Sequence, residues 1–281
     1  AVTPTATPTP TSNVLGPGPT WTPTPTRSGP TPSYKLCEDI AGTGNSSTKY
    51  DLVFLSSGYP DVATLLTDAE EAAGYFSNTN LGPLLNKIKF KAYTKLDRDY
   101  NIHHCDPTKP TSFPCWDINM ATTGKAICNG DGYIILLYMP KIRENQAGAE
   151  AVQKSWGGIN GVADGLGTGG SMVFRAGLEV APHEVSHSLA GALDEYTLYD
   201  PFGSNPDTSW IPFNCSIQSS GNEDIACPKW QASFPDVKCL LGCGYPDFYR
   251  PGNNNIMNND SHTVFDKPTL KMWTDALKNF Q

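Results

Sequence analysis

Long apolar runs and an excess of positive charge are both missing from this chain of 281 residues. No apolar stretch approaches the roughly 20 residues that a membrane-spanning helix needs, so we expect no membrane span. Lys and Arg number 20 against 28 Asp and Glu, which gives a net charge of −8. Because nucleic acids and anionic membranes attract basic proteins, this balance argues against both as partners. The chain also begins without a basic, apolar leader, as a mature form would.

Charged residues are scarcest at the start of the chain. Residues 1–34 contain nine Pro and ten Thr with a single charge, on Arg27. Such a composition cannot bury a core, and Pro–Thr repeats hold an extended form. We therefore expect a disordered linker or stalk over 1–34 and one globular domain over 35–281. A stalk of this kind predicts that the protein is secreted or held at the cell surface.

Histidine is also rare, with five in the chain, yet two form a regular pattern within the run PHEVSHSLAGALDEY at 182–196. His183 and His187 are four residues apart, so on a helix they lie on one face, with Glu184 beside them. Two neutral imidazoles are suitable zinc ligands. A neighbouring carboxylate can take a proton from a zinc-activated water and deliver it to a leaving amine. The pattern therefore predicts a zinc hydrolase with Glu184 as the general base and acid.

A third metal ligand has to come from beyond this helix. A continuous helix would carry a residue seven positions past His187 more than about 10 Å along the axis, out of reach. The chain must turn, and Gly191 permits the left-handed conformation that a reversal needs. Metzincins, the zincins with a Gly turn, place Gly seven and the third ligand ten residues after the first His. Here both are displaced by one, to Gly191 and Asp194, which predicts the same turn with one extra residue in the helix.

Two alternatives to Asp194 deserve comparison. Glu195 is the direct rival, being the next residue in the chain. A Glu on a later helix is a further option, as in thermolysin-like enzymes, but the only glutamate after Glu195 is Glu223. That residue lies in a Cys- and Ser-rich stretch with no helical period. We therefore expect Asp194 to be the ligand and Glu195 to support it, for instance through an ion pair with Arg250.

Pro182, immediately before His183, limits the helix that carries the two imidazoles. Proline inside a helix loses a hydrogen bond and clashes with the preceding turn, but it is tolerated in the first turn. Either the helix starts at about Ala181, leaving two or three turns before Gly191, or it is kinked at the proline. Both versions still present the two His on one face.

The run HEVSHSLAGALDEY resembles the signature of metallopeptidase family sixty-four, the IgA-peptidase family, whose members carry HExxH followed by a DEY triplet. Three further stretches are similar to that family: an opening strand with a Gly-Tyr turn at 51–59, a cysteine-rich segment with a YRP motif at 239–251, and a Met-turn at 254–257. The resemblance spans roughly residues 50 to 260. It implies that Met257 lies in the tight turn beneath the zinc.

The order of predicted elements fits the same architecture. Apolar or alternating runs predict strands at 52–55, 87–92, 133–139 and 171–174, with helices at 61–76 and 268–280. The strand at 133–139 is apolar throughout and should be central, whereas alternating Lys at 87–92 predicts one solvated face. The Gly-rich stretch 157–170 should form an exposed approach to the active helix. We expect an α/β (α+β) fold of the zincin or metzincin-like kind: a mixed twisted sheet and the active-site helix (upper part, 35–190) over a loop-rich lower subdomain (191–281).

The eight cysteines are even in number, and in an oxidising compartment the default is four disulfides. Their pairing cannot be deduced from spacing. A structural zinc site that uses Cys239 and Cys243 is the competing interpretation, although secreted proteins seldom keep free thiolates for that purpose.

The remaining candidates have weaker support. Tyr196, Tyr245 and Tyr249 are possible hydrogen-bond donors to the tetrahedral intermediate, a role that zincins often give to Tyr or His. His103 and His104 beside Cys105 are adjacent, so their side chains diverge and do not predict a second metal site.

We therefore predict a secreted or surface-tethered zinc endopeptidase that acts, as a monomer, on a protein or peptide substrate. The alternative is a non-catalytic module that keeps the zincin fold to bind a glycan or a host protein. The intact general base argues against that alternative, because a binding module has no need of it.

Overall fold

The computed structural model describes residues 33–42, 44, 46–96, 100, 102–105, 114–138, 160–197, 211–259 and 262–281. Residues 34–281 belong to one compact unit. The linker predicted for 1–34 lies, apart from its last two residues, outside the described residues.

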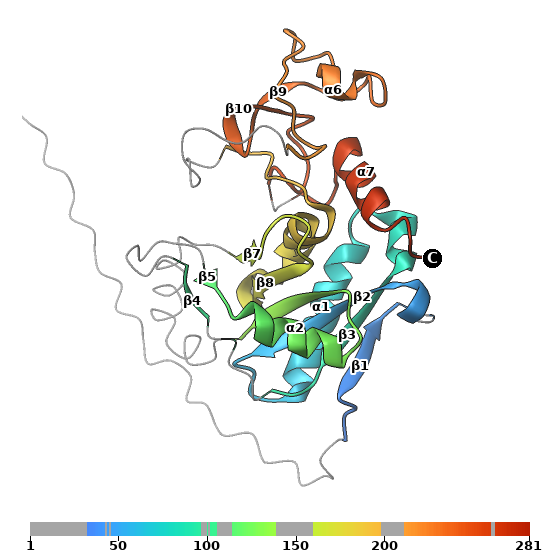
Figure 1. Ribbon diagram of the computed structural model, residues 1–281, viewed down its shortest axis with the longest axis vertical. Helices are drawn as coiled ribbons and strands as arrows, with labels where there is room; N and C mark the ends of the chain where they lie inside the picture. The colour runs from blue at the N-terminus through green and yellow to red at the C-terminus, as the bar shows by residue number, and fades with distance from the viewer. Residues whose placement is uncertain are drawn as a thin grey trace, which may run out of the picture. The chain divides into compact units, whose positions relative to one another are not determined.

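A six-stranded mixed sheet forms the centre of the structure (Figure 1). Its strands are β1 (Cys37–Ala41), β2 (Tyr50–Ser57), β3 (Ile88–Tyr93), β6 (Gly132–Leu137), β7 (Gly161–Ala163) and β8 (Gly170–Phe174), in the order β1-β3-β2-β6-β8-β7. The four inner strands are parallel, and the edge strands β1 and β7 are antiparallel to their neighbours. The apolar run expected to be central is confirmed as β6, between β2 and β8.

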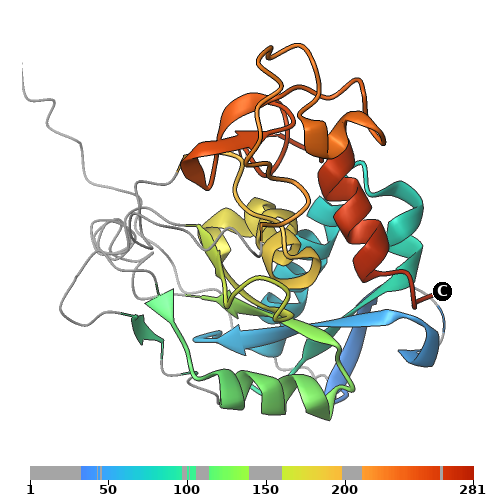
Figure 2. The ribbon, with the colours of Figure 1, turned by 45° about the horizontal axis from the view of Figure 1, so that its top comes forward.

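Both faces of the sheet are covered, as the strictly buried pattern of β2 requires. Leu52 and Phe54 point to the face covered by α1 (Val62–Ser77), by the helix bearing the two His and by α7 (Lys267–Ala276). Val53 and Leu55 point to the opposite face, covered by α2 (Ile118–Ile127). Figure 2 shows α2 on one side of the sheet and the other helices on its far side.

Shorter elements complete the structure. They are η1 (Ser46–Thr48), η2 (Gly82–Lys87), β4 (His103–His104) paired with β5 (Pro114–Cys115), η3 (Arg175–Val180), α5 (Ala181–Val185), η4 (Ser186–Ala190), α6 (Pro228–Gln231), and β9 (Leu240–Cys243) paired with β10 (Tyr245–Arg250). The expected class, a mixed sheet with the active-site helix above a second, smaller part, is confirmed.

Two local expectations are wrong. Lys91 of β3 does not face solvent: it is buried and binds Asp51 at 2.7 Å and the carbonyl of Cys128 at 3.0 Å, so the alternating Lys pattern does not mark a solvated face. Part of the Gly-rich approach is the edge strand β7. The lower subdomain is loop-rich, as expected, and the segment around Cys239 and Cys243 within it folds into the β9–β10 hairpin.

All eight cysteines are paired in four disulfides: Cys37–Cys128, Cys105–Cys115, Cys215–Cys243 and Cys227–Cys239. Cys239 and Cys243 therefore go to different partners, which excludes a thiolate-ligated structural zinc site at these residues. Within the described parts of the chain, no helix has the length and apolar character needed to cross a membrane.

Candidate metal centre

The helix with the two His begins at Ala181, so Pro182 lies in its first turn, where its missing N–H is tolerated. After Val185 the helix changes to a π-helical turn, Ser186–Ala190. A π turn holds one more residue than an α turn over the same length. This π turn accommodates the extra residue between His183 and Gly191. Gly191 therefore still ends the helix directly after the turn that carries His187, despite the longer spacing.

Serine hydroxyls satisfy carbonyls along this irregular helix. Ser186 donates to the carbonyl of Pro182 at 2.7 Å, and Ser171 of β8 donates to the carbonyl of Glu184 at 3.0 Å. The C-terminal helix braces the same turn, because the indole N–H of Trp273 donates to Ser186 Oγ at 2.9 Å. These contacts hold the helix rigidly against both the sheet and α7.

Gly191 ends the helix in the left-handed conformation, with φ of 73° and ψ of 23°. Its N–H donates to the carbonyl of His187 at 3.0 Å, and the N–H of Ala192 reaches the carbonyl of Ser186 at 3.1 Å. The chain therefore reverses directly after the helix and returns beneath it with Asp194.

Replacing Gly191 by Ala is expected to lower the free energy of unfolding by about 1–2 kcal/mol, the cost of a left-handed non-glycine residue. Space is not the limit, because the nearest atom to a new Cβ is Gly167 N at 3.9 Å. Gly191→Asn should lose less, since Asn tolerates this conformation. Urea unfolding of the two variants measures the difference, and equal losses would show that backbone strain is not the cause.

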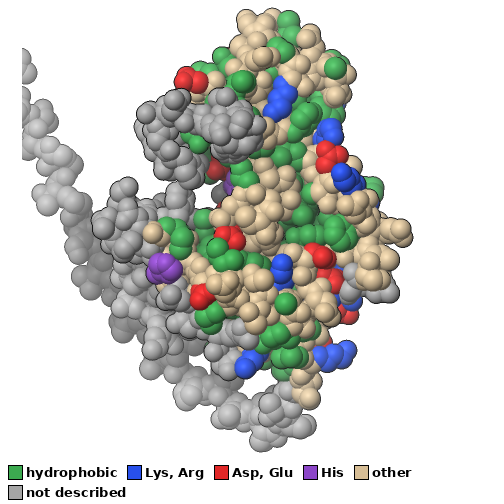
Figure 3. Space-filling model, in the orientation of Figure 1, with side chains coloured by type: hydrophobic (Ala, Val, Ile, Leu, Met, Phe, Trp, Pro, Cys, Tyr) green, Lys and Arg blue, Asp and Glu red, His purple; other side chains and the backbone are tan. Residues whose placement is uncertain are grey.

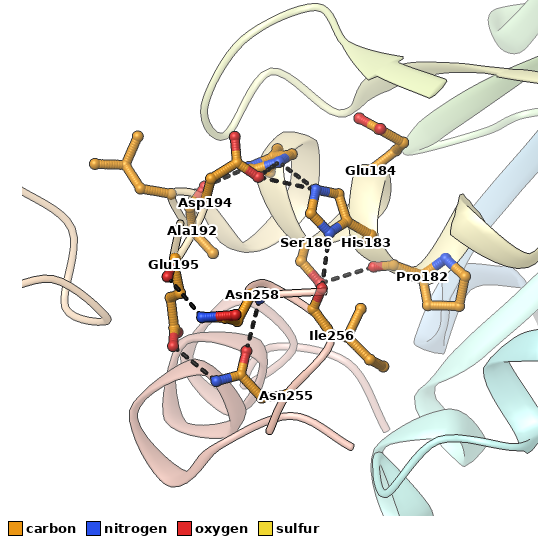
Figure 4. A network of polar contacts seen from close by, with 12 residues as sticks. Pro182, His183, Glu184, Ser186, Ala192, Asp194, Glu195, Asn255, Ile256 and Asn258 are labelled. Carbon is orange, nitrogen blue, oxygen red and sulfur yellow. Dashed lines mark hydrogen bonds and ion pairs between the residues drawn. The ribbon is translucent and has the colours of Figure 1, made fainter. Parts of the chain in front are cut away.

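Asp194 and the two His converge on one point, and Figure 4 shows Asp194 facing His183. Asp194 Oδ1 lies 3.0 Å from His183 Nε2 and 3.3 Å from His187 Nε2. The two Nε2 atoms are 3.0 Å apart. Ligand atoms at about 2.0–2.2 Å from a tetrahedral zinc are roughly 3.3 Å from one another, so the spacing suits an ion of that size.

The outer nitrogens of both rings are already engaged. His183 Nδ1 lies 3.0 Å from the carbonyl of Ile256, and His187 Nδ1 lies 2.7 Å from the carbonyl of Ala192. Since a carbonyl only accepts, each Nδ1 carries the proton and each neutral Nε2 presents a lone pair. Asp194 Oδ1 is buried without a hydrogen-bond donor. Three acceptor atoms that face one another can share a cation, so these ligand atoms fit a metal.

The opposite charges within the cluster shift the pKa values of its members. Burial disfavours the charged form of His187, but the Asp194 carboxylate outweighs it, and the pKa of His187 is raised. Burial likewise raises the pKa of Asp194, yet the two His outweigh it and hold that pKa well below its ordinary value. Asp194 thus remains ionised and draws positive charge into the site.

Glu184 is 7% exposed and lies on the side of the helix that faces β7 (Figure 4). Strand β7 passes close to Glu184: a Cβ built on Gly161 would lie 2.6 Å from Glu184 Cγ. A glycine at position 161 therefore leaves the room that the Glu184 side chain occupies.

Met257 is fully buried in the tight turn formed by residues 255–258, in which Asn258 N donates to the carbonyl of Asn255 at 3.1 Å. The carbonyl of Ile256, in the same turn, is the partner of His183. The turn expected from the sequence thus lies directly against a metal-site residue.

Glu195 points away from the cluster, toward this turn and α7 (Figure 4). It does not form the expected ion pair with Arg250, whose guanidinium binds the carbonyls of Leu241 and Gly242 and the side chain of Asn253. Burial and the neighbouring Asp266 carboxyl raise the pKa of Glu195 well above its ordinary value, which favours the protonated acid.

The other candidates are scattered. Tyr245 is buried against Phe248, with ring centroids 5.0 Å apart, and Tyr249 packs beside the cluster around Trp230. Tyr196, two residues after Asp194, is 36% exposed. His103 and His104 form the short strand β4, and the described metal-capable cluster consists of His183, His187 and Asp194.

Sequence reasoning missed the groups that orient the cluster. The carbonyls of Ala192 and Ile256 carry no signal, since every residue has a carbonyl. The close approach of Gly161 to Glu184 likewise depends on strand β7, which the sequence did not reveal. The sequence also gave no indication that Asn214 and Asn255 contact Glu195.

Comparisons with known proteins add little to this geometry. No protein-family model and no curated protein matches the chain. Among solved structures, an archaemetzincin from Methanopyrus kandleri is similar with a TM-score of 0.33 and 11% identical residues, over 83% of this chain and 98% of that one. A TM-score this low carries no weight by itself, so fold and site rest on the residues described above.

Proposed function

We propose that this chain is a zinc-dependent endopeptidase. The observation that carries the proposal is the meeting of Asp194 Oδ1 with the Nε2 atoms of His183 and His187, whose helix also carries Glu184. A buried site of two imidazoles and one carboxylate is a ligand set that zinc prefers in hydrolases.

Zinc bound at such a site would supply Lewis acidity, which makes water a nucleophile at neutral pH. In the proposed reaction Glu184 accepts the proton of the attacking water and passes it to the leaving nitrogen. The hydrogen bonds from both Nδ1 atoms to carbonyls keep the rings in the tautomer whose Nε2 carries the lone pair. Tyr196, the most exposed of the three candidate tyrosines, is the proposed donor to the substrate oxygen.

Peptide is the substrate class that suits the surroundings. Among the described residues, β7 is the edge of the sheet, and it passes directly beside Glu184. An extended peptide can add to such an edge through main-chain hydrogen bonds, which places its carbonyls in register with the site. In Figure 3 a His and an acidic side chain are visible in a recess of the surface.

The proposed compartment is extracellular, since four disulfides persist in oxidising surroundings. Membership of metallopeptidase family sixty-four remains part of the proposal and rests on the DEY, YRP and Met-turn motifs. Hydrolysis of immunoglobulin A does not follow from that resemblance, because substrates differ among proteins that share a fold.

The deciding experiment measures zinc content and peptide cleavage together. We expect one zinc per chain, cleavage within a mixed peptide library, loss of cleavage on chelation and its return with added zinc. Stoichiometric zinc without cleavage of any peptide would instead indicate the non-catalytic binding module. Absence of zinc from protein refolded with excess metal would contradict the metal site itself.

Gly161→Ala is expected to lower peptide hydrolysis by about a hundredfold, because a shift of ~1 Å in a catalytic group can have that effect. The new Cβ would lie 2.6 Å from Glu184 Cγ and 2.8 Å from its Oε1, so the flexible side chain must move. Zinc content should not change, since the three metal-site residues are untouched. Gly74→Ala on α1, where a Cβ meets nothing within 4 Å, is the matched control. Full activity of Gly161→Ala would contradict the assigned place of Glu184.

A further inference from the structure

Glu195 is fully buried, yet it lies next to a metal-site residue without joining the cluster. Its Oε2 accepts from Asn255 Nδ2 at 2.8 Å. Its Oε1 accepts from Asn214 Nδ2 and from Thr269 Oγ1, each at 3.2 Å. One carboxyl group therefore binds side chains from three segments that are far apart in the sequence.

The backbone of Glu195 binds the same turn as its side chain. Its N–H donates to the carbonyl of Met257 at 2.6 Å, and its own carbonyl accepts from Asn258 Nδ2 at 2.9 Å. Together with Asn255, this makes three hydrogen bonds between Glu195 and the turn at 255–258. The segment that carries Asp194 cannot move relative to this turn without breaking them.

The turn at 255–258 also fixes the orientation of one of the imidazoles. The carbonyl of Ile256 binds His183 Nδ1 at 3.0 Å and so sets both the tautomer and the plane of that ring. A continuous chain of contacts thus runs from Asp194 through Glu195 and Asn255 to Ile256 and His183.

A second chain of contacts reaches the other imidazole. Thr269, which binds Glu195, lies in the first turn of α7, and Trp273 of the same helix donates to Ser186 Oγ at 2.9 Å. Ser186 directly precedes His187. Glu195 therefore connects to both His residues, along the turn on one side and along α7 on the other.

Asn214 completes the enclosure of Glu195. Besides Glu195 it binds Leu193 twice, accepting from its N–H at 3.1 Å and donating to its carbonyl at 2.8 Å. The disulfide Cys215–Cys243 holds the segment that carries Asn214. Asn214 stands in an Asn-Cys-Ser sequon, but it is fully buried and hydrogen-bonded, so its role in the folded protein is this contact.

We propose that Glu195 is a positioning residue for the metal site: it binds no metal, and its buried carboxyl group sets the separation of Asp194 from the two imidazoles. The inference rests on the proposed function, because it assumes that the cluster binds zinc. Glu195 directly follows Asp194, and it binds Asn255, whose neighbour Ile256 binds His183.

The test compares zinc affinity in the full chain, by competition with a chelator, for the wild type, Glu195→Ala, Glu195→Gln and a control. Removal of groups that orient metal ligands lowers affinity by about 10–100-fold, and we expect Glu195→Ala to fall in that range. Glu195→Gln should lose less affinity than Glu195→Ala, because its amide fills the same space and its one oxygen still accepts from Asn255 or from Asn214, although not from both. With cobalt in place of zinc, Glu195→Ala should also change the visible absorption bands, which report ligand geometry.

Asp51→Asn is the control for a general loss of stability. Asp51 is as buried as Glu195 and binds Lys91 at 2.7 Å in strands β2 and β3. It touches none of the metal-site residues, so the variant should lose stability and keep both zinc affinity and the cobalt spectrum. If Glu195→Ala does not fold, Asn255→Ser removes the donor to Oε2 and tests the same connection.

The outcomes separate the two proposals. Wild-type protein that binds no zinc contradicts the proposed function. Wild-type protein that binds zinc, with unchanged affinity and cobalt spectrum in Glu195→Ala, overturns the positioning role alone. Complete loss of zinc in both Glu195→Ala and Glu195→Gln would make Glu195 a ligand and would also overturn it.

Discussion

Glu184→Gln is expected to lower peptide hydrolysis by at least about a hundredfold, the low end of what a general acid–base group contributes. Glutamine keeps the shape of the side chain but cannot accept the proton of the attacking water. Zinc should remain bound at one equivalent, because Glu184 is not among the three clustered residues. Cleavage rates measured beside zinc content separate the loss of the base from the loss of the metal.

Glu179→Gln is the matched control for this change. Glu179 lies on the preceding short helix, η3, and is exposed, so the same substitution alters charge without touching the site. We expect wild-type hydrolysis from it. Hydrolysis by Glu184→Gln at the same rate as this control would eliminate the proposed mechanism.

Asp194→Ala is expected to remove zinc from the protein, with a loss of affinity greater than the ~10–100-fold seen when only an orienting group is lost. Two imidazoles alone leave the ion without the carboxylate that balances its charge. Because a ligand that binds only the folded state raises its stability, added zinc should raise the Tm of the wild type and leave that of Asp194→Ala unchanged. Thermal unfolding with and without zinc is the measurement.

Asp247→Ala serves as the control, because Asp247 is an exposed residue of β10 in the same part of the molecule. Its Tm should respond to zinc as that of the wild type does. A zinc-dependent rise of Tm in Asp194→Ala would show that another residue is the third ligand, and the argument from the Gly turn would then fail.

The local features of the site could be predicted from the sequence because they depend on neighbouring residues. Two His four apart on one helix, a proline confined to its first turn and a glycine at its end follow from short-range geometry. The offset of Gly191 and Asp194 by one position predicted an extra helical residue. The structure accommodates it as the π turn Ser186–Ala190, a detail that spacing could not locate.

Prediction of the strands from the sequence had the same limit. Apolar runs revealed β2, β6 and β8, but β7 is only three residues long and lies in a Gly-rich stretch without alternation. Lys91 was expected to face solvent because Lys usually does, and it is buried because Asp51 on the adjacent strand compensates its charge. Both the formation of β7 and the burial of Lys91 depend on how strands pair, which the pattern within one strand does not show.

By itself, therefore, the sequence determined the local features of the candidate site: which helix carries the imidazoles, where the chain reverses and which carboxylate the reversal brings to them. Only the tertiary structure decided what holds those groups in place. His183 meets the carbonyl of Ile256 across 73 residues, and Asn255 meets Glu195 across 60. The physical reason is that short-range sterics fix a helix and its turn, whereas a contact between distant segments exists only once the sheet, the disulfides and α7 have brought those segments together.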